Sequence, residues 1–128
     1  MDTKTVIISR TDSIGDVILT LPTANILRKM YPKAKILFLG SSYTRPIIEC
    51  CGDIDEFLDW TEIQKLDKKS QANFFKKTEA DTIIHVFPNK EISRIARKAK
   101  IKNRIGTSHR LYHWFTCNRL INFTRKRS

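Results

Sequence analysis

The sequence lacks the features that define several large classes of proteins. Its 128 residues contain no apolar run near the ~18 residues that a membrane-spanning helix requires. Only three cysteines are present, two of them adjacent, and an odd count without metal-ligand spacing favours reduced thiols. We therefore expect no membrane span, no disulfide framework and no cysteine metal site.

Glycine is also scarce, with four residues in the whole chain. Gly15 is the only glycine in the first polar turn, whereas the G-x-G-x-x-G fingerprint of dinucleotide sites needs three for close approach of the pyrophosphate. No Gly-Lys-Ser/Thr sequence of a P-loop is present either. The sequence thus lacks the usual fingerprints of nucleotide binding.

Acidic residues are few: 13 stand against 24 lysines and arginines, which gives a formal net charge of +11. Such a charge calls for an anionic partner, which could be nucleic acid, a phosphorylated glycolipid or an acidic membrane surface. Charge alone does not choose among them. A basic nucleic-acid-binding α/β module without catalysis is therefore an alternative function, with the basic segment after Asn89 gripping phosphates and Tyr112, Trp114 and Phe115 stacking on bases.

Strand-like and helix-like segments alternate along the chain. Short apolar, β-branched runs predict strands at 6–8, 35–40, 56–60, 82–87 and 104–107. Apolar residues at helical spacing predict helices at 15–31, after 41–46, at 62–78 and after Asn89. Pro22 predicts a kink or break in the first helix, because proline removes a backbone hydrogen bond. In the third helix the expected core residues are Ile63, Leu66, Phe74 and Phe75.

This alternation predicts one domain, residues 1–128, with a parallel sheet covered by helices on both faces. In the usual strand order 3-2-1-4-5, the order reverses between the first and fourth strands. The loops at 10–15 and 88–90 would then flank one crevice, which brings Asp16 and Asn89 near each other.

Asp16 is the strongest candidate for chemistry, since it lies where the first turn becomes a helix. Ser13-x-x-Asp16 matches a capping box, in which the carboxylate only satisfies the helix N-terminus. A carboxylate in that position is also held ionised and fixed in direction, which suits a general base. The two roles are compatible, and spacing alone does not separate them.

The three histidines do not form an evident metal site. His85 falls inside a predicted strand and is expected to be a packed, hydrogen-bonded core residue. His109 and His113 are four residues apart and would align on a helix, but no third ligand accompanies them. We therefore predict no bound metal.

Several motifs resemble those of the glycosyltransferase family 9 enzymes, the lipopolysaccharide heptosyltransferases and their relatives. The amino-terminal signature is Arg10-Thr11-Asp12-Ser13-Ile14-Gly15-Asp16-Val17 followed by Leu19-Thr20-Leu21-Pro22. Weaker pieces follow in order: Phe38-Leu39-Gly40, Ile54-Asp55-Glu56, Asp81-Thr82-Ile83-Ile84-His85 and Asn103-Arg104-Ile105-Gly106. Together they cover nearly the whole chain.

The resemblance implies an α/β, Rossmann-like, three-layer domain that forms the amino-terminal, acceptor-side half of a GT-B fold. It implies an inverting transfer of a sugar, heptose in the best-known members, from a nucleotide sugar such as ADP-heptose to a lipopolysaccharide core or related glycan. Asp16 would be the base, and neither a cofactor nor a metal would be needed. The candidate acceptor-binding residues are Arg10, Ser13, Gly15, Asn89, Lys90, His109 and Arg110.

The family's second, nucleotide-sugar-binding domain has no counterpart in these 128 residues, so we expect the chain alone to be inactive as a transferase. Met1–Lys4 lead directly into the first strand without a signal-peptide pattern. We therefore expect a cytoplasmic protein, with peripheral contact at the inner membrane face where the family's anionic acceptor lies.

Overall fold

Five parallel strands form one sheet in the computed structural model, which describes residues 5–86 and 89–105. The strands are β1 (Thr5–Ser9), β2 (Lys35–Gly40), β3 (Glu56–Asp59), β4 (Thr82–His85) and β5 (Asn103–Ile105). Their order in the sheet is β3-β2-β1-β4-β5, and every neighbouring pair is parallel. The predicted α/β class and strand order are confirmed.

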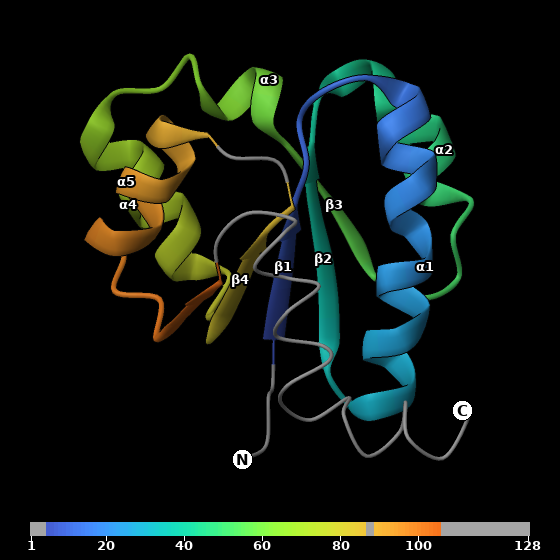
Figure 1. The fold of residues 1–128 in the computed structure, drawn as a ribbon. Helices are drawn as coiled ribbons and strands as arrows, with labels where there is room; N and C mark the ends of the chain where they lie inside the picture. Colours follow the sequence, from blue (N-terminus) through green and yellow to red (C-terminus); the bar gives the residue numbers. More distant parts are fainter. Residues whose placement is uncertain (1–4, 87–88, 106–128) are drawn as a thin grey trace.

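Helices cover both faces of the sheet, as predicted (Figure 1). One face carries α1 (Ile14–Met30), the short 3-10 helix η1 (Ser42–Thr44) and α2 (Arg45–Glu49); the other carries α3 (Trp60–Ile63), α4 (Lys68–Lys77) and α5 (Lys90–Lys98). Alternate residues of β1 enter two apolar clusters, Val6 and Ile8 on the α1 side and Ile7 on the α5 side. Burial on both sides explains the unbroken apolar sequence of the central strand.

The first helix is continuous, so a break at Pro22 is wrong, while the alternative of a kink stays a prediction. α1 runs over 17 residues with Pro22 inside it. The missing proline donor would have bonded the carbonyl of Ile18, four residues earlier. Both residues are exposed, so water can satisfy that carbonyl and the helix continues while Val17, Ala24 and Leu27 stay buried. Within residues 5–86 and 89–105, no helix combines the length and apolar character needed to cross a membrane.

The single helix expected at 62–78 is two helices, α3 and α4. Gln71 explains the division, because its side-chain Nε2 donates to the carbonyls of Ile63 (3.3 Å) and Gln64 (3.4 Å), at the end of α3. Ile63 and Phe75 are buried and Phe74 is partly buried, as predicted. Leu66 lies in the turn between the helices and is 43% exposed, so its assignment to the core is wrong.

Smaller differences concern the ends of strands. Trp60 begins α3 instead of ending β3, because Asp59 caps that helix by accepting a hydrogen bond from the Glu62 backbone. β4 ends at His85, and β5 begins one residue earlier than predicted, at Asn103. Val86, which was predicted to belong to β4, forms a bend after it, and the other predicted positions, Phe87 and residues 106–107, lie outside the described residues.

Arg28 holds the far end of α1 against the amino end of the sheet. Its guanidinium donates to the carbonyls of Pro32, Ala34 and Asp53, and to the Asp55 carboxylate at 2.7 Å. The same Asp55 oxygen accepts the backbone N–H of Ile36 at 2.8 Å, at the start of β2. These contacts fix the direction of the helix whose opposite end carries Asp16.

Candidate functional site

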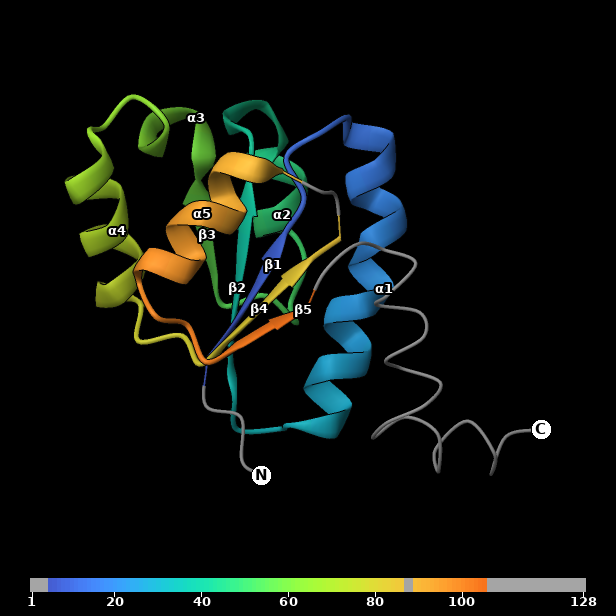
Figure 2. The same ribbon diagram turned by 60° about the vertical axis from the view of Figure 1, so that its left-hand side comes forward.

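Asp16 lies at the carboxyl edge of the sheet, where β1 gives way to α1. β1 and β4 are paired with Ser9 aligned to His85, the last residue of each strand. The chain leaves β1 toward one face of the sheet and leaves β4 toward the other, so α1 and α5 begin at the same edge on opposite faces (Figure 2). Open parallel sheets bind ligands at such a switch point.

Ser13 fixes the orientation of the Asp16 carboxylate. Ser13 is the N-cap of α1, and its Oγ accepts the backbone N–H of Asp16 at 3.4 Å. The same hydroxyl donates to Asp16 Oδ2 at 2.7 Å. The Asp16 side chain nevertheless remains 44% exposed. The Asp16 carboxylate is therefore hydrogen-bonded to the N-cap residue and accessible to solvent at the same time.

Arg10 approaches the same carboxylate from the loop before Ser13. Its Nη2 lies 3.5 Å from Asp16 Oδ1, while its Nε lies 3.0 Å from Asp12 Oδ1. The Arg10 side chain is 16% exposed. Its guanidinium thus faces two carboxylates of its own loop, and the predicted contact of Arg10 with an acceptor anion remains a prediction.

These contacts favour the ionised form of Asp16. The hydrogen bond from the Ser13 hydroxyl makes the largest contribution to lowering the pKa of Asp16, and the positive charge of Arg10 lowers it further. Asp16 is consequently a carboxylate at neutral pH and can accept a proton.

The loop that carries Arg10 and Asp12 is held in place by the segment after β2. Ser41 Oγ donates to the Thr11 carbonyl at 2.8 Å, and the Tyr43 hydroxyl donates to the Asp12 carbonyl at 2.9 Å. Sequence reasoning missed both residues, because partners about thirty positions apart leave no local pattern. An alternating strand–helix sequence could indicate only that the loops after β1 and β2 are neighbours.

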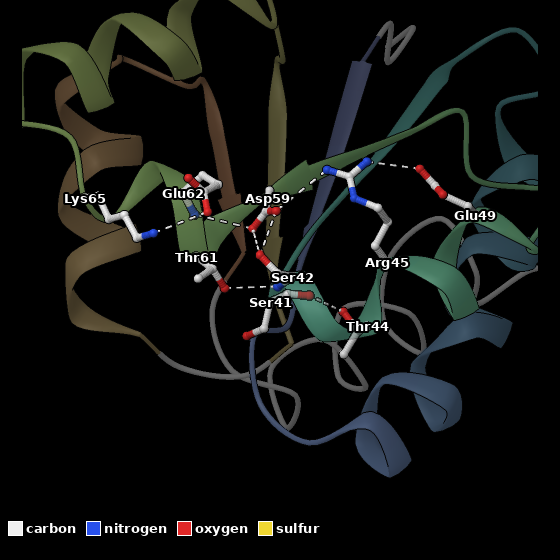
Figure 3. Close-up of polar contacts among 9 residues, drawn as sticks. All are labelled: Ser41, Ser42, Thr44, Arg45, Glu49, Asp59, Thr61, Glu62 and Lys65. Carbon is white, nitrogen blue, oxygen red and sulfur yellow. Dashed lines mark hydrogen bonds and ion pairs between the residues drawn. The ribbon is translucent and has the colours of Figure 1, made fainter.

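A second set of polar contacts holds η1 itself, as Figure 3 shows. The Ser42 hydroxyl lies 2.7 Å from both Asp59 carboxylate oxygens, and the Ser42 N–H donates to Thr61 Oγ1 at 3.0 Å. Arg45 forms ion pairs with Glu49 and Asp59. The segment that holds the loop of Arg10 and Asp12 is therefore itself hydrogen-bonded to residues at the start of α3, on the other face of the sheet.

Gly15 leaves the surface beside Asp16 bare. A Cβ built on Gly15 would meet no atom within 4 Å, and no described glycine has a positive φ angle. Neither packing nor backbone conformation therefore requires glycine at this position. Because glycine is a poor helix former, its presence in the first turn of α1 carries a small cost in stability.

Asn89 and Lys90 lie at the start of α5. Asn89 is the N-cap, and its Oδ1 accepts the backbone N–H of Ile92 at 3.0 Å. Lys90 follows as the first helical residue and is exposed. The two residues lie at the same sheet edge as Asp16, but on the opposite face. His109 and Arg110 lie outside the described residues.

His85 is buried, at 5% exposure, as predicted, but the predicted hydrogen bond is not found within residues 5–86 and 89–105. Among the residues that the structure describes, neither of its ring nitrogens has a hydrogen-bond partner, and the buried Ser9 Oγ beside it in the sheet register also has none. Burial is the main cause that lowers the pKa of His85, and the charge of Arg104 adds to the effect. The histidine is therefore neutral at pH 7.

The fold and the polar edge define a Rossmann-like α/β domain with a carboxylate at its switch point, and known proteins share this architecture. A Haemophilus influenzae protein named "Putative glycosyltransferase" is 30% identical over 102 residues, which are 79% of this chain and 30% of that protein. No family model matches the chain.

Two solved structures have the same fold. The glycosyl transferase family 9 protein of Veillonella parvula DSM 2008 aligns with a TM-score of 0.64 and 24% identity, over 83% of this chain and 32% of that one. The ADP-heptose lps heptosyltransferase II of E. coli aligns with a TM-score of 0.66 and 18% identity, over 79% of this chain and 29% of that one.

These similarities confirm the resemblance to the glycosyltransferase family 9 enzymes that the sequence motifs indicated. The chain has the fold of one part of those structures. It spans about a third of the length of the proteins that it matches.

Proposed function

We propose that this chain is the acceptor-binding, base-carrying domain of an inverting glycosyltransferase. The observation that carries the proposal is the Asp16 carboxylate, which is ionised, partly exposed and fixed by Ser13 at the switch point of the sheet. The similarity to glycosyltransferases in sequence and fold supports the reaction class. The name of the E. coli structure suggests ADP-heptose as donor and a lipopolysaccharide core or related glycan as acceptor.

In the proposed reaction Asp16 removes the proton from an acceptor hydroxyl as its oxygen attacks the anomeric carbon of the donor sugar. The new carbon–oxygen bond forms on the face opposite the leaving nucleotide diphosphate, which departs with the bonding electron pair. The configuration at the anomeric carbon is therefore inverted, and Asp16 is left protonated. The Ser13 hydrogen bond directs one carboxylate oxygen and leaves the other on the Arg10 side.

The acceptor is proposed to lie along the carboxyl edge between the starts of α1 and α5. The bare Gly15 surface permits close approach to Asp16. Ser13 and Asn89 offer polar side chains at the two helix starts, while Lys90 supplies an exposed positive charge for an acidic or phosphorylated sugar. Arg10 would act mainly by fixing the loop between β1 and α1, through its contacts with Asp12 and Asp16.

The nucleotide sugar is proposed to bind to a second domain that faces this edge, as in the GT-B arrangement. The outer face of α1 beside Asp16 is apolar and open: Leu19 is 78% exposed, Ile18 48% and Ile14 39%. Exposed apolar side chains in one place are typical of a surface that another body covers. This arrangement predicts that the 128-residue chain alone transfers no sugar.

A calorimetric titration of the chain at near-physiological salt tests the binding role. The ligands are a phosphorylated core oligosaccharide with acidic sugars, ADP and a short duplex DNA. Saturable binding of the oligosaccharide without binding of ADP supports an acceptor domain. Tight, steeply salt-dependent DNA binding with no response to the oligosaccharide would instead favour the nucleic-acid-binding alternative.

The role of Asp16 as base is tested in a protein that contains both domains. Asp16→Asn keeps the size of the side chain but removes the base, so we expect turnover to fall by ~10²–10⁴. Asp67→Asn is the matched control, since Asp67 occupies the N-cap of α4 and asparagine is also a good cap. Turnover within a few-fold of the unchanged protein in Asp16→Asn would refute the assignment.

A further inference from the structure

Tyr43 is an exposed aromatic residue at the carboxyl edge of the sheet. It lies in η1, shortly after the end of β2, and is 59% exposed. Its ring belongs to neither of the two apolar clusters of the core, so packing of the described residues does not explain it. A single exposed aromatic residue is ordinary on a protein surface. The position of Tyr43 and its contacts therefore decide whether it has a role.

Tyr43 lies beside the loop that leads to Asp16. Its hydroxyl donates to the carbonyl of Asp12 at 2.9 Å, in the turn between β1 and α1. The sheet places β2, β1 and β4 side by side in that order, and Tyr43, Asp16 and Lys90 follow these three strands in turn. Asp16 therefore stands between the other two in the order of the strands. A ligand that runs along the edge from the start of α5 past Asp16 reaches Tyr43.

The backbone around Tyr43 is firmly held. Thr44 is fully buried, and its Oγ1 donates to the carbonyl of Ser41 at 2.7 Å. Ser42 is hydrogen-bonded to residues of β3 and α3 (Figure 3). A Cβ built on Gly40 would lie 3.1 Å from Thr44 Oγ1, so η1 packs closely against the end of β2. A tyrosine has two side-chain torsions and loses little conformational entropy when its ring contacts a ligand. The ring is thus a preorganised contact surface.

The charges near η1 favour an uncharged ligand. Arg10, in the neighbouring loop, and Arg45, at the start of α2, are each ion-paired with two carboxylates. An acidic group beside Tyr43 would therefore compete with these carboxylates for positive charge. At the other end of the same edge Lys90 is exposed. The two ends of the edge consequently differ in the charge of the group that each can accept.

A neutral sugar ring matches the properties of the η1 end. One face of a pyranose ring presents mainly C–H groups, which carry a partial positive charge, whereas the face of an aromatic ring is negative. Stacking the two faces buries apolar surface and leaves the hydroxyl groups at the rim of the sugar free for hydrogen bonds. An exposed, rigid aromatic ring beside a candidate base is therefore suited to orient a sugar.

We propose that Tyr43 is a specificity-determining residue of the acceptor site, whose ring stacks against a neutral sugar while an acidic group of the acceptor lies toward Lys90. This role rests on the proposed function and deepens it, because it gives the acceptor more than one sugar and a direction along the carboxyl edge. Tyr43 takes no part in the proton transfer at Asp16.

Two variants without the hydroxyl group separate the aromatic ring from the hydrogen bond. Tyr43→Phe and Tyr43→Leu both lose the bond to Asp12, but only phenylalanine keeps an aromatic face. In calorimetric titration with a phosphorylated core oligosaccharide that contains neutral and acidic sugars, Tyr43→Phe should bind within ~2-fold of the unchanged chain and Tyr43→Leu about 5-fold more weakly. Equal affinities of the two variants would overturn the stacking.

Ser41→Ala is the matched control for the loop. It removes the hydrogen bond to the Thr11 carbonyl and leaves the ring of Tyr43 in place, so it should bind the oligosaccharide as Tyr43→Phe does. A loss as large as that in Tyr43→Leu would mean that the position of the loop, not the aromatic face, determines binding.

Proton NMR of the oligosaccharide identifies the sugar that stacks. Protons that lie over the face of an aromatic ring shift upfield. The C–H protons of a neutral sugar should therefore shift upfield with the unchanged chain and with Tyr43→Phe, but not with Tyr43→Leu. Upfield shifts confined to an acidic sugar, or shifts that persist in Tyr43→Leu, would overturn the proposal.

Kinetics in a protein that contains both domains separate this role from that of Asp16. Tyr43→Leu should raise the KM for the acceptor about 5-fold and leave kcat within ~2-fold, because the ring contacts the acceptor equally in the ground state and the transition state. A lower kcat with an unchanged KM would overturn the proposal. If the unchanged chain does not bind the oligosaccharide, the proposed function fails together with the role of Tyr43. If it binds but the ring makes no difference, only the role of Tyr43 fails.

Discussion

Gly15→Ala separates a structural from a functional reason for glycine beside Asp16. The new methyl group would meet no atom within 4 Å, and the backbone of Gly15 does not adopt a positive φ. Alanine should therefore fit the first turn of α1 without strain. Because glycine in a helix is less favourable than alanine by roughly 0.5–1 kcal/mol, the substitution should stabilise the fold by about that amount.

The expected change is measurable by thermal denaturation followed by circular dichroism. A gain of this size corresponds to a rise of about 2–6 °C in Tm for a domain of this length. A lower Tm for Gly15→Ala would refute the reasoning, because it would show that glycine serves the fold itself. Gly52→Ala is the matched control, since a Cβ on Gly52 also meets no atom within 4 Å and Gly52 lies far from the carboxyl edge.

Calorimetric titration with the core oligosaccharide then tests function on the same variants. If the acceptor approaches Asp16 across the bare surface, Gly15→Ala should bind it at least ~10-fold more weakly although the fold is more stable, because a methyl group would displace the ligand from hydrogen-bonding range. Gly52→Ala should bind it as the unchanged chain does. Equal affinities in all three proteins would mean that the acceptor does not use this surface.

Two further predictions concern titratable groups. His85 has its pKa lowered from 6.5 in the folded state, mainly by burial, so the unfolded chain takes up a proton more readily. The free energy of unfolding should therefore decrease as the pH is lowered below 6.5. In urea unfolding at several pH values, His85→Gln should reduce this decrease. An equal decrease in the variant and the unchanged chain would mean that another group titrates. Ser13→Ala removes the hydrogen bond that most lowers the pKa of Asp16, so this pKa should rise, as carboxyl NMR can measure. An unchanged pKa would contradict the role of Ser13, and Ser13→Thr should restore the original value.

The sheet could be predicted from sequence because its signals are local and repeated. Each central strand is an unbroken apolar run, as burial on both faces requires, and helical spacing follows each run. Strands that alternate with helices leave few possible topologies, so the strand order followed. Ser13 also marked the N-cap of α1 correctly, since the pattern Ser13-x-x-Asp16 is recognisable from four residues of sequence.

The sequence predictions were wrong where a contact with a distant residue or with solvent outweighs a local sequence preference. Proline inside a helix kinks or breaks it, but Ile18, whose carbonyl loses its partner, is an exposed residue, so water can satisfy that carbonyl and α1 continues. The lysine-rich segment at 62–78 resembles one helix, but Gln71 folds back onto the end of α3 and divides it. The ion pairs of Arg10 with Asp12 and Asp16 could not be derived either. The conformation of that loop depends on hydrogen bonds from Ser41 and Tyr43, which are distant in the sequence.

The capping and catalytic interpretations of Asp16 have the same physical origin. A hydroxyl N-cap and a helix N-terminus stabilise negative charge, and this stabilisation holds the carboxylate ionised whether or not a substrate is present. A cap alone, however, does not require the bare Gly15 beside Asp16. Asp67, at the N-cap of α4, provides the comparison within the same chain, since it is also an exposed carboxylate with a lowered pKa. A loss of turnover in Asp16→Asn, with Asp67→Asn unaffected, would therefore separate the base from the cap.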